Sequence, residues 1–209
     1  MRIRKNLGQL RDDYLIRLDR LEQRFDEVLR LNDPRHDGKT SISYCVIELM
    51  NGYRDFNRAL LASSMIGART TLGNKTKTPG VEYEYDFIDT VFQIVKKRTD
   101  STRHSWNSRD EPAWEAEINR LATLLQLQNE LSISTAFSIS GFYKDIKVIR
   151  NFFCHRSRLL FDEVKNVGLS HLISGNSAEE IMTTREKNGD YLLHYWVDQC
   201  RIYAEFSVE

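Results

Sequence analysis

The sequence has little of what disulfide-linked, turn-rich or membrane-spanning proteins need. Its 209 residues include 3 cysteines, 3 prolines and 10 glycines. Cys45, Cys154 and Cys200 are too few and too far apart for a disulfide framework, and the scarcity of proline and glycine argues against an all-β chain dense in turns. No apolar run approaches the roughly 20 residues of a membrane span. The basic N-terminus has no apolar run behind it, so we expect no secretory signal and a cytoplasmic protein.

Neither positive nor negative charge is in excess. The chain has 30 lysines and arginines and 30 aspartates and glutamates, with 41% hydrophobic and 29% charged residues. This composition is typical of a globular protein rather than a disordered one. Zero net charge excludes a simple polycation that coats nucleic acid, although a local basic site remains compatible with it. The length fits one domain, and we expect a single domain over residues 1–209.

Apolar residues recur in steps of three and four, which is the spacing of amphipathic helices. One such stripe starts at Leu7 and stops at Asn32-Asp33-Pro34. We expect further helices that start at about Thr40 or Ser41 and at Pro112, and one over residues 86–97. One or two helices are expected over 131–165, with Gly168 as the C-cap. Two more are expected, one after a capping box at Ser177–Glu180 and one after the turn Asn188-Gly189-Asp190. Residues 67–83 and 98–111 are expected to be loops. The pattern therefore predicts an all-α helical bundle.

The last helix has a predicted core of its own. Its apolar stripe consists of Leu193, Trp196, Val197, Cys200, Tyr203 and Phe206. No phosphate-binding loop, paired Cys-x-x-Cys or other metal-ligand spacing accompanies the helices. We therefore expect no metal site and no cofactor.

One segment, residues 144–158, combines an apolar face with a basic one. On a helix, its apolar residues Ile146, Val148, Ile149, Phe152 and Phe153 fall in one arc, and its polar residues fall in the opposite arc. Asn151 and His155 are four residues apart and share a face. Arg150 and His155 are about 140° apart around the axis, so they do not meet tip to tip unless the helix bends or a second copy of the chain contributes.

The run Arg150-Asn151-Phe152-Phe153-Cys154-His155 resembles the Arg-x4–6-His signature of the HEPN superfamily, in the form with asparagine directly after arginine. The resemblance implies a small all-α domain whose motif-bearing helix covers about 141–165. It also implies a metal-independent endoribonuclease that dimerises to bring two motifs together and leaves 2′,3′-cyclic phosphate and 5′-OH ends. Toxins and phage-defence effectors are common in this family, so an antitoxin or another defence-system protein is an expected partner. Ser157 stands where one toxin branch has a tyrosine that is modified, so that form of control is not expected.

The residue types of the segment suit this chemistry. His155 could act as general base or acid, Arg150 could stabilise the phosphorane-like transition state, and Asn151 could orient the histidine or bind a phosphate oxygen. The predicted RNA-binding residues are the surrounding cations Lys144, Lys147, Arg156 and Arg158. A second basic stretch, residues 96–109, adds His104 and Trp106, which could stack on an unpaired base.

Each candidate site residue also has a structural interpretation that involves no function. Arg150 and His155 could belong to a solvated helix face, and Asn151 could satisfy a backbone group. Cys154 is expected to be a small packing residue, and Glu48 is a less favoured polar partner of the site. Residues 96–109 are expected to form a solvated loop rather than an RNA contact. His171 and His194 are interpreted as surface or helix-end residues. The alternative function is a non-catalytic HEPN-like module that binds RNA, a nucleotide or a protein.

Overall fold

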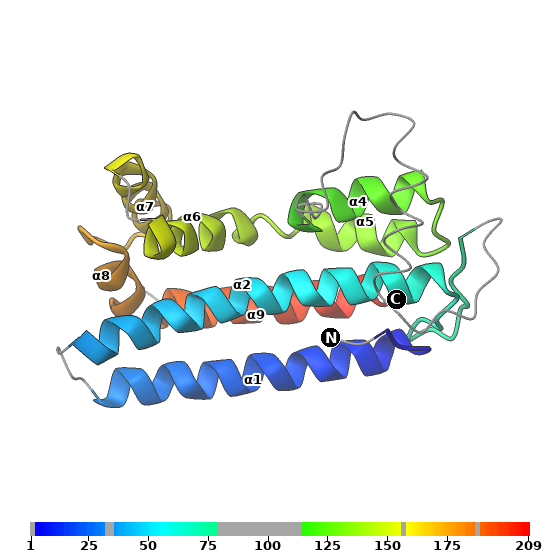
Figure 1. Ribbon diagram of the computed structural model, residues 1–209, viewed down its shortest axis with the longest axis horizontal. Coiled ribbons are helices and arrows are strands. Elements are labelled where there is room, and N and C mark those ends of the chain that lie inside the picture. The colour runs from blue at the N-terminus through cyan, green and yellow to red at the C-terminus, as the bar shows by residue number, and fades with distance from the viewer. Residues whose placement is uncertain (1–2, 32–35, 79–113, 156–157, 187–188) are drawn as a thin grey trace. The chain divides into compact units, whose positions relative to one another are not determined.

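The computed structural model describes residues 3–31, 36–78, 114–155, 158–186 and 189–209 (Figure 1), with the side chains of residues 36–40 and 114–117 left undescribed. In these ranges it contains eight helices and no strand, which confirms the all-α prediction. The helices are α1 (Leu7–Leu31), α2 (His36–Met65), α4 (Trp114–Leu124), α5 (Glu130–Ser138), α6 (Phe142–His155), α7 (Arg158–Ser170), α8 (Ala178–Thr183) and α9 (Leu192–Ser207).

Several helix boundaries differ from the sequence pattern. Helix α2 begins at His36, before the predicted Thr40 or Ser41, and three helices rather than one or two occupy residues 130–170. Two helices, α6 and α7, lie where one motif-bearing helix is predicted over about 141–165. The helix predicted over 86–97 and the basic stretch 96–109, with His104 and Trp106, lie outside the described residues. The predicted loop 67–83 is non-helical as far as Thr78, where description stops.

Two compact units can be distinguished within the chain. Unit 1 comprises Met1–Leu15, Tyr53–Ile139 and Ile202–Glu209, and unit 2 comprises Ile16–Gly52 and Ser140–Arg201. Helices α1, α2 and α9 each have residues in both units. No helix of the described residues is long and apolar enough to cross a membrane.

Aromatic side chains form the core of unit 1. Tyr14 of α1 stacks on Phe56 of α2 with ring centroids 4.6 Å apart, and Tyr203 of α9 lies 5.0 Å from Tyr53. The Tyr203 hydroxyl donates a buried hydrogen bond of 2.6 Å to Oδ1 of Asn57. Such a bond matters because a buried polar group without a partner costs about 1–3 kcal/mol. Helices α4 and α5 pack side by side in this unit (Figure 1).

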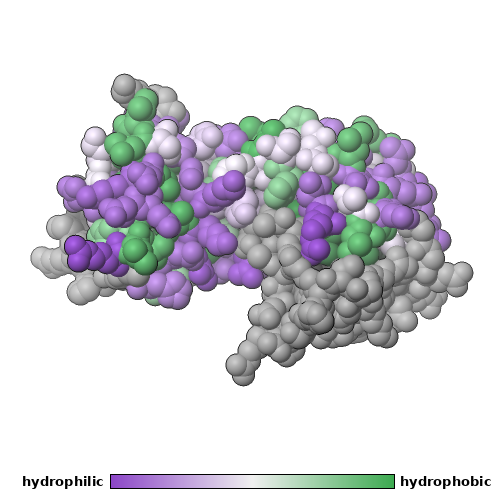
Figure 2. Space-filling model, turned by 90° about the horizontal axis from the view of Figure 1, so that it is seen from above, coloured by the Kyte–Doolittle hydropathy of each residue, from purple (hydrophilic) through white to green (hydrophobic). Residues whose placement is uncertain are grey.

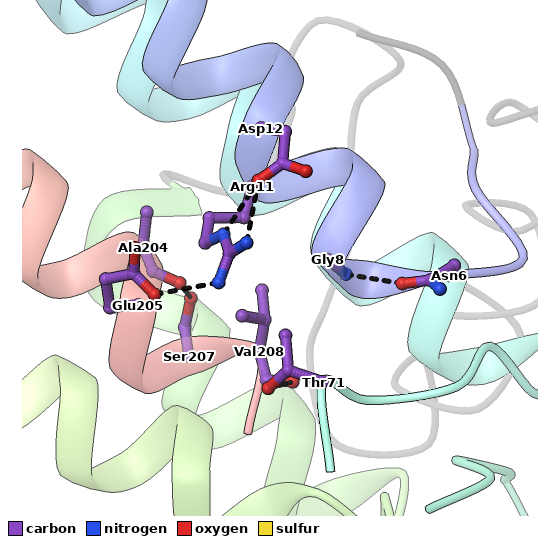
Figure 3. Close-up of polar contacts among 9 residues, drawn as sticks. All are labelled: Asn6, Gly8, Arg11, Asp12, Thr71, Ala204, Glu205, Ser207 and Val208. Carbon is purple, nitrogen blue, oxygen red and sulfur yellow. Dashed lines mark hydrogen bonds and ion pairs between the residues drawn. The ribbon is translucent and has the colours of Figure 1, made fainter. Parts of the chain in front are cut away.

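A polar cluster joins the start of α1 to the end of α9 in the same unit (Figure 3). The Arg11 guanidinium donates to the carboxylates of Asp12 and Glu205, at 2.8–2.9 Å. Close by, the backbone N–H of Thr71 donates to the carbonyl of Val208 at 2.9 Å. Segments from both ends of the chain are therefore fixed to each other.

In unit 2, the second half of α1 packs against the first half of α9. The ring of Phe25 contacts those of His194 and Tyr191, at 5.6 and 6.0 Å. Helices α6, α7 and α8 form a further packed group in this unit, with α7 running crosswise to α6 (Figure 1). The motif-bearing helix α6 is thus supported by two neighbouring helices.

Two details of this group correct or refine the prediction. Gly168 is not a C-cap, because α7 continues to Ser170 and Gly168 is buried inside it. A Cβ at this position would lie 2.9 Å from both the carbonyl oxygen of Ile173 and Cδ1 of Ile181, so glycine permits close packing. Ser177 does cap α8 by accepting from Glu180 N–H, but the Glu180 carboxylate accepts from the N–H of Asn176 rather than that of Ser177.

The predicted core of the last helix is confirmed apart from its final residue. The first five predicted residues of that stripe are buried in α9. Phe206 is 42% exposed, since it lies in the last turn of the helix. The stripe therefore identifies the buried face but not where burial ends.

Candidate functional site on helix α6

Helix α6 buries one face and exposes the other, as its sequence predicts. The buried residues are Phe142, Ile146, Ile149 and Phe152, whereas Val148 and Phe153 are only partly covered. The ring of Phe152 contacts that of Phe161 on α7 edge-on, at 4.9 Å. This apolar contact fixes the rotation of α6 about its axis and so determines which side chains remain on the surface.

Two of the predicted site residues are in direct contact. The half-buried guanidinium of Arg150 donates a hydrogen bond of 3.1 Å from Nη1 to Oδ1 of Asn151. The amide oxygen of Asn151 thereby accepts one hydrogen bond, and the other N–H groups of the pair remain as donors. A group of N–H donors that includes a permanent cation suits an oxyanion such as a phosphate oxygen.

His155 is exposed at the end of α6, one turn beyond Asn151. Among the described residues, no hydrogen bond or ion pair joins it to Arg150 or Asn151. The structure thus places the three predicted catalytic residues on one helix but brings only two of them together. The angular separation expected from the sequence accounts for this result.

The predicted RNA-binding cations are on the surface where the structure describes them. Lys144 and Lys147 are exposed on α6, and Arg158 is exposed at the start of α7. Arg156 lies outside the described residues. The described cations therefore leave their charge available to an anion.

His171 is the residue near the site that sequence reasoning missed. Its Nε2 lies 3.1 Å from Oδ2 of Asp145 on α6, and its Nδ1 lies 3.3 Å from Oε1 of Glu186. Its ring also contacts that of Tyr195 edge-on, at 5.3 Å. His171 directly follows α7, as the helix-end interpretation expects, but it is a partly buried link between Asp145 of α6 and Glu186 after α8 and not a surface residue. Nothing in the local sequence signals a contact over 26 residues.

Three other sequence interpretations are decided by the contacts. Cys154 is exposed and is therefore not the packing residue that we expected. Glu48 forms an ion pair with Arg17, with 3.2 Å between Oε2 and Nη2, and so stabilises the packing of α1 on α2. His194 forms a pair with Asp26, at 2.9 Å, between α9 and α1.

Apolar side chains are exposed on α7, the helix that packs against α6. On α7, Leu159 is 83% exposed, Leu169 is 65% exposed and Phe161 is 40% exposed. Figure 2 shows green apolar surface beside purple polar surface on the side where Figure 1 draws α7. These exposed side chains give α7 apolar surface that a partner could cover. No family model matches this chain, and no curated protein or solved structure is significantly similar to it.

Proposed function

We propose that this protein is a metal-independent endoribonuclease of the HEPN type, a toxin or phage-defence effector that acts in the cytoplasm. The observation that carries the proposal is the Arg150–Asn151 hydrogen bond on the exposed face of α6, with His155 one turn further along that helix. Lys144, Lys147 and Arg158 add exposed positive charge around it. These groups supply what transesterification of RNA needs without a metal ion.

The proposed reaction is attack of a ribose 2′-oxygen on the adjacent phosphorus. One imidazole accepts the 2′-OH proton, a P–O2′ bond forms, and the P–O5′ bond breaks. A second, protonated imidazole donates its proton to the departing O5′. The products are a 2′,3′-cyclic phosphate and a 5′-OH end. Histidine suits both transfers because it changes charge near neutral pH, while Arg150 stabilises the phosphorane-like transition state.

A second copy of the chain supplies the second imidazole in this proposal. Support comes from the separation of Arg150 and His155 on one helix, about 140° around the axis. The exposed leucines of α7 offer apolar surface that a homodimer could bury beside α6. An antitoxin or another defence-system protein is a further proposed partner that would restrain the active dimer.

Cleavage of a fluorescent single-stranded RNA tests the proposal. We expect Arg150→Ala and His155→Ala each to lower the rate at least about 100-fold, the low end of general acid–base contributions. The matched control is Cys154→Ala, an exposed neighbour on the same turn, which should cleave like the wild type. EDTA should leave the rate unchanged, and the products should carry cyclic phosphate ends. Undiminished cleavage by purified His155→Ala protein would overturn the assignment.

Mixing wild-type and His155→Ala proteins tests the shared site. A mixed dimer holds one imidazole where the proposed reaction needs two, so it should not cleave RNA. We therefore expect the cleavage rate per wild-type chain to fall as an excess of His155→Ala protein is added and mixed dimers form. An unchanged rate in a mixture that forms mixed dimers would rule out a composite site.

A non-catalytic RNA-binding module is the second candidate. The observation that favours it is that, in the described residues, no side chain orients the His155 imidazole. A catalytic base is normally held by a neighbouring group, whereas a binding surface needs no such positioning. RNA binding without fragments, even from a fully dimeric preparation, would favour this function over the nuclease.

A further inference from the structure

A second basic surface lies in unit 1, on backbone segments that take no part in the α6 site. Three short extended segments lie side by side, with Arg69 in the middle. Arg69 forms a parallel bridge with Asn6 and an antiparallel bridge with Lys75. The bonds that hold them are Arg69 N–H to Lys5 O (2.9 Å), Leu7 N–H to Arg69 O (2.8 Å), Thr70 N–H to Asn74 O (2.8 Å) and Thr76 N–H to Ala68 O (2.7 Å). We name residues 5–7 and 68–77 the basic ribbon.

In the basic ribbon, the charged side chains lie on one face and the small uncharged side chains lie on the other. Ala68, Thr70 and Thr76 are buried, whereas Arg69 and Lys75, on the opposite face, are exposed. Lys77 continues the alternation and is also exposed, while Thr78 is buried. Successive side chains of an extended chain point to opposite faces, so these three cations share one outward face.

In the part of the chain that the structure describes, no acid is paired with the cations of this face. Residues 66–78 include no aspartate or glutamate. In the described part of the chain, Lys5, Lys75 and Lys77 have no ion pair, and the Arg69 guanidinium donates to the carbonyl of Gly73, at 3.1 Å. Arg4 and Arg11 in the same unit are, by contrast, paired with Asp13 and with Asp12 and Glu205.

The backbone beneath these cations is held in place. Gly67, in the turn between α2 and the ribbon, and Gly73, in the turn within the ribbon, adopt φ values of +87° and +83°, which side-chain-bearing residues rarely adopt. A Cβ at Gly67 would lie 3.0 Å from the carbonyl oxygen of Thr76. The Thr76 hydroxyl donates to Ala68 O at 3.0 Å within the buried layer. A preformed array of charges loses little conformational freedom on binding a polyanion.

We propose that the basic ribbon binds the phosphate backbone of single-stranded RNA, as a docking surface for the substrate class of the proposed function, on which this inference rests. Lys75 and Lys77 are two residues apart in extended chain, or about 7 Å along it. This repeat is comparable to that of phosphates along an extended single strand, which positively charged grooves follow in proteins that bind single strands. An anionic membrane fits less well, since Leu72 is the one large apolar side chain exposed on the ribbon.

The test compares two double charge reversals in a His155→Ala background, which removes cleavage from the measurement. Lys75→Glu/Lys77→Glu changes the ribbon, and Arg20→Glu/Lys165→Glu makes the same change of charge at exposed residues of unit 2. Binding of a fluorescent oligouridine is followed by anisotropy between about 50 and 200 mM salt. We expect the ribbon variant to bind at least tenfold more weakly, with the slope of log K against log salt reduced by about 1.4, since each phosphate contact contributes about 0.7.

The control variant should bind within twofold of the parent, and both variants should melt at the parent temperature. Equal weakening in the two variants, or unchanged binding in the ribbon variant, would overturn the proposal. Binding of the parent to phosphatidylserine vesicles but not to RNA would also overturn it. If the wild type cleaves no RNA but the ribbon variant selectively loses binding, the nuclease proposal is rejected and the proposed role of the ribbon is kept. If cleavage depends on His155 but not on Lys75 and Lys77, the nuclease proposal is kept and the proposed role of the ribbon is rejected.

Discussion

At the scale of single residues, the three cysteines have different environments. Cys45 and Cys200 are buried, and Cys154 is exposed next to His155. Burial raises the pKa of the Cys45 thiol from its ordinary 9.0 to about 11, against the opposing effect of Arg24, while Glu48 raises it further. Because the thiolate is the reactive form, Cys45 should be chemically inert in the folded protein.

We expect a thiol reagent at about pH 8 to modify Cys154 alone in the folded protein and all three cysteines after unfolding. Mass spectrometry of protein alkylated with and without denaturant measures this difference. Modification of Cys45 at the rate of Cys154 without denaturant would contradict the buried environment described for it.

The same pKa shift has a consequence for stability. The unfolded chain loses the Cys45 proton near pH 9, whereas the folded chain keeps it until about pH 11. Above pH 9 the unfolded state therefore binds fewer protons, so the free energy of unfolding falls as the pH rises from 9 to 11. Chemical denaturation across this range should show a shallower fall for Cys45→Ala than for the wild type.

At the scale of helices and turns, Gly168 determines how closely α7 approaches its neighbours. An alanine there would place its Cβ 2.9 Å from a backbone carbonyl of Ile173 and from the Ile181 side chain. Alanine is intrinsically better than glycine in a helix by about 1 kcal/mol. Because the carbonyl belongs to the backbone and cannot rotate away, the steric cost should outweigh this gain.

We expect Gly168→Ala to lower the free energy of unfolding by about 1–3 kcal/mol, as overpacked core positions do. The matched control is Gly141→Ala, because a Cβ at Gly141 meets nothing within 4 Å. Urea denaturation should place the control within about 0.5 kcal/mol of the wild type. A stabilised Gly168→Ala protein would mean that α7 and α8 are packed less tightly than described.

The helices show which structural features the periodicity of apolar residues predicts and which it does not. The stripe from Leu10 to Phe25 is buried as predicted, because a long amphipathic helix repeats its signal many times. The glycine at 168 has the sequence context of a helix end, and only its contact with Ile181 reveals its packing role. His171 illustrates the same limit at the site, since its partners Asp145 and Glu186 come from segments that only tertiary structure brings together.

At the scale of the whole molecule, three helices have residues in both compact units. Melting one unit removes part of α1, α2 and α9, and with it hydrogen bonds that continue into the other unit. Helix formation is cooperative along a continuous segment. The two units should therefore unfold together.

We expect one thermal transition by circular dichroism, shifted as a whole by a substitution in either unit. The unit 2 variant is Gly168→Ala. The unit 1 variant is Tyr203→Phe, which leaves the buried Asn57 amide oxygen without this donor at a cost of about 1–3 kcal/mol. A curve in which each substitution moves only part of the amplitude would show independent units instead.

The contacts between the first and last helices also constrain how the chain is made. Asp19 and Glu22 meet Arg201 across 182 and 179 positions, at 2.8 and 2.7 Å, and Arg11 meets Glu205 across 194. A ribosome adding about 5–20 residues per second needs on the order of ten to forty seconds to deliver these partners. During that interval the nascent chain carries Leu18 and Phe25 without the neighbours that finally cover them, which makes the growing polypeptide a natural client for a chaperone.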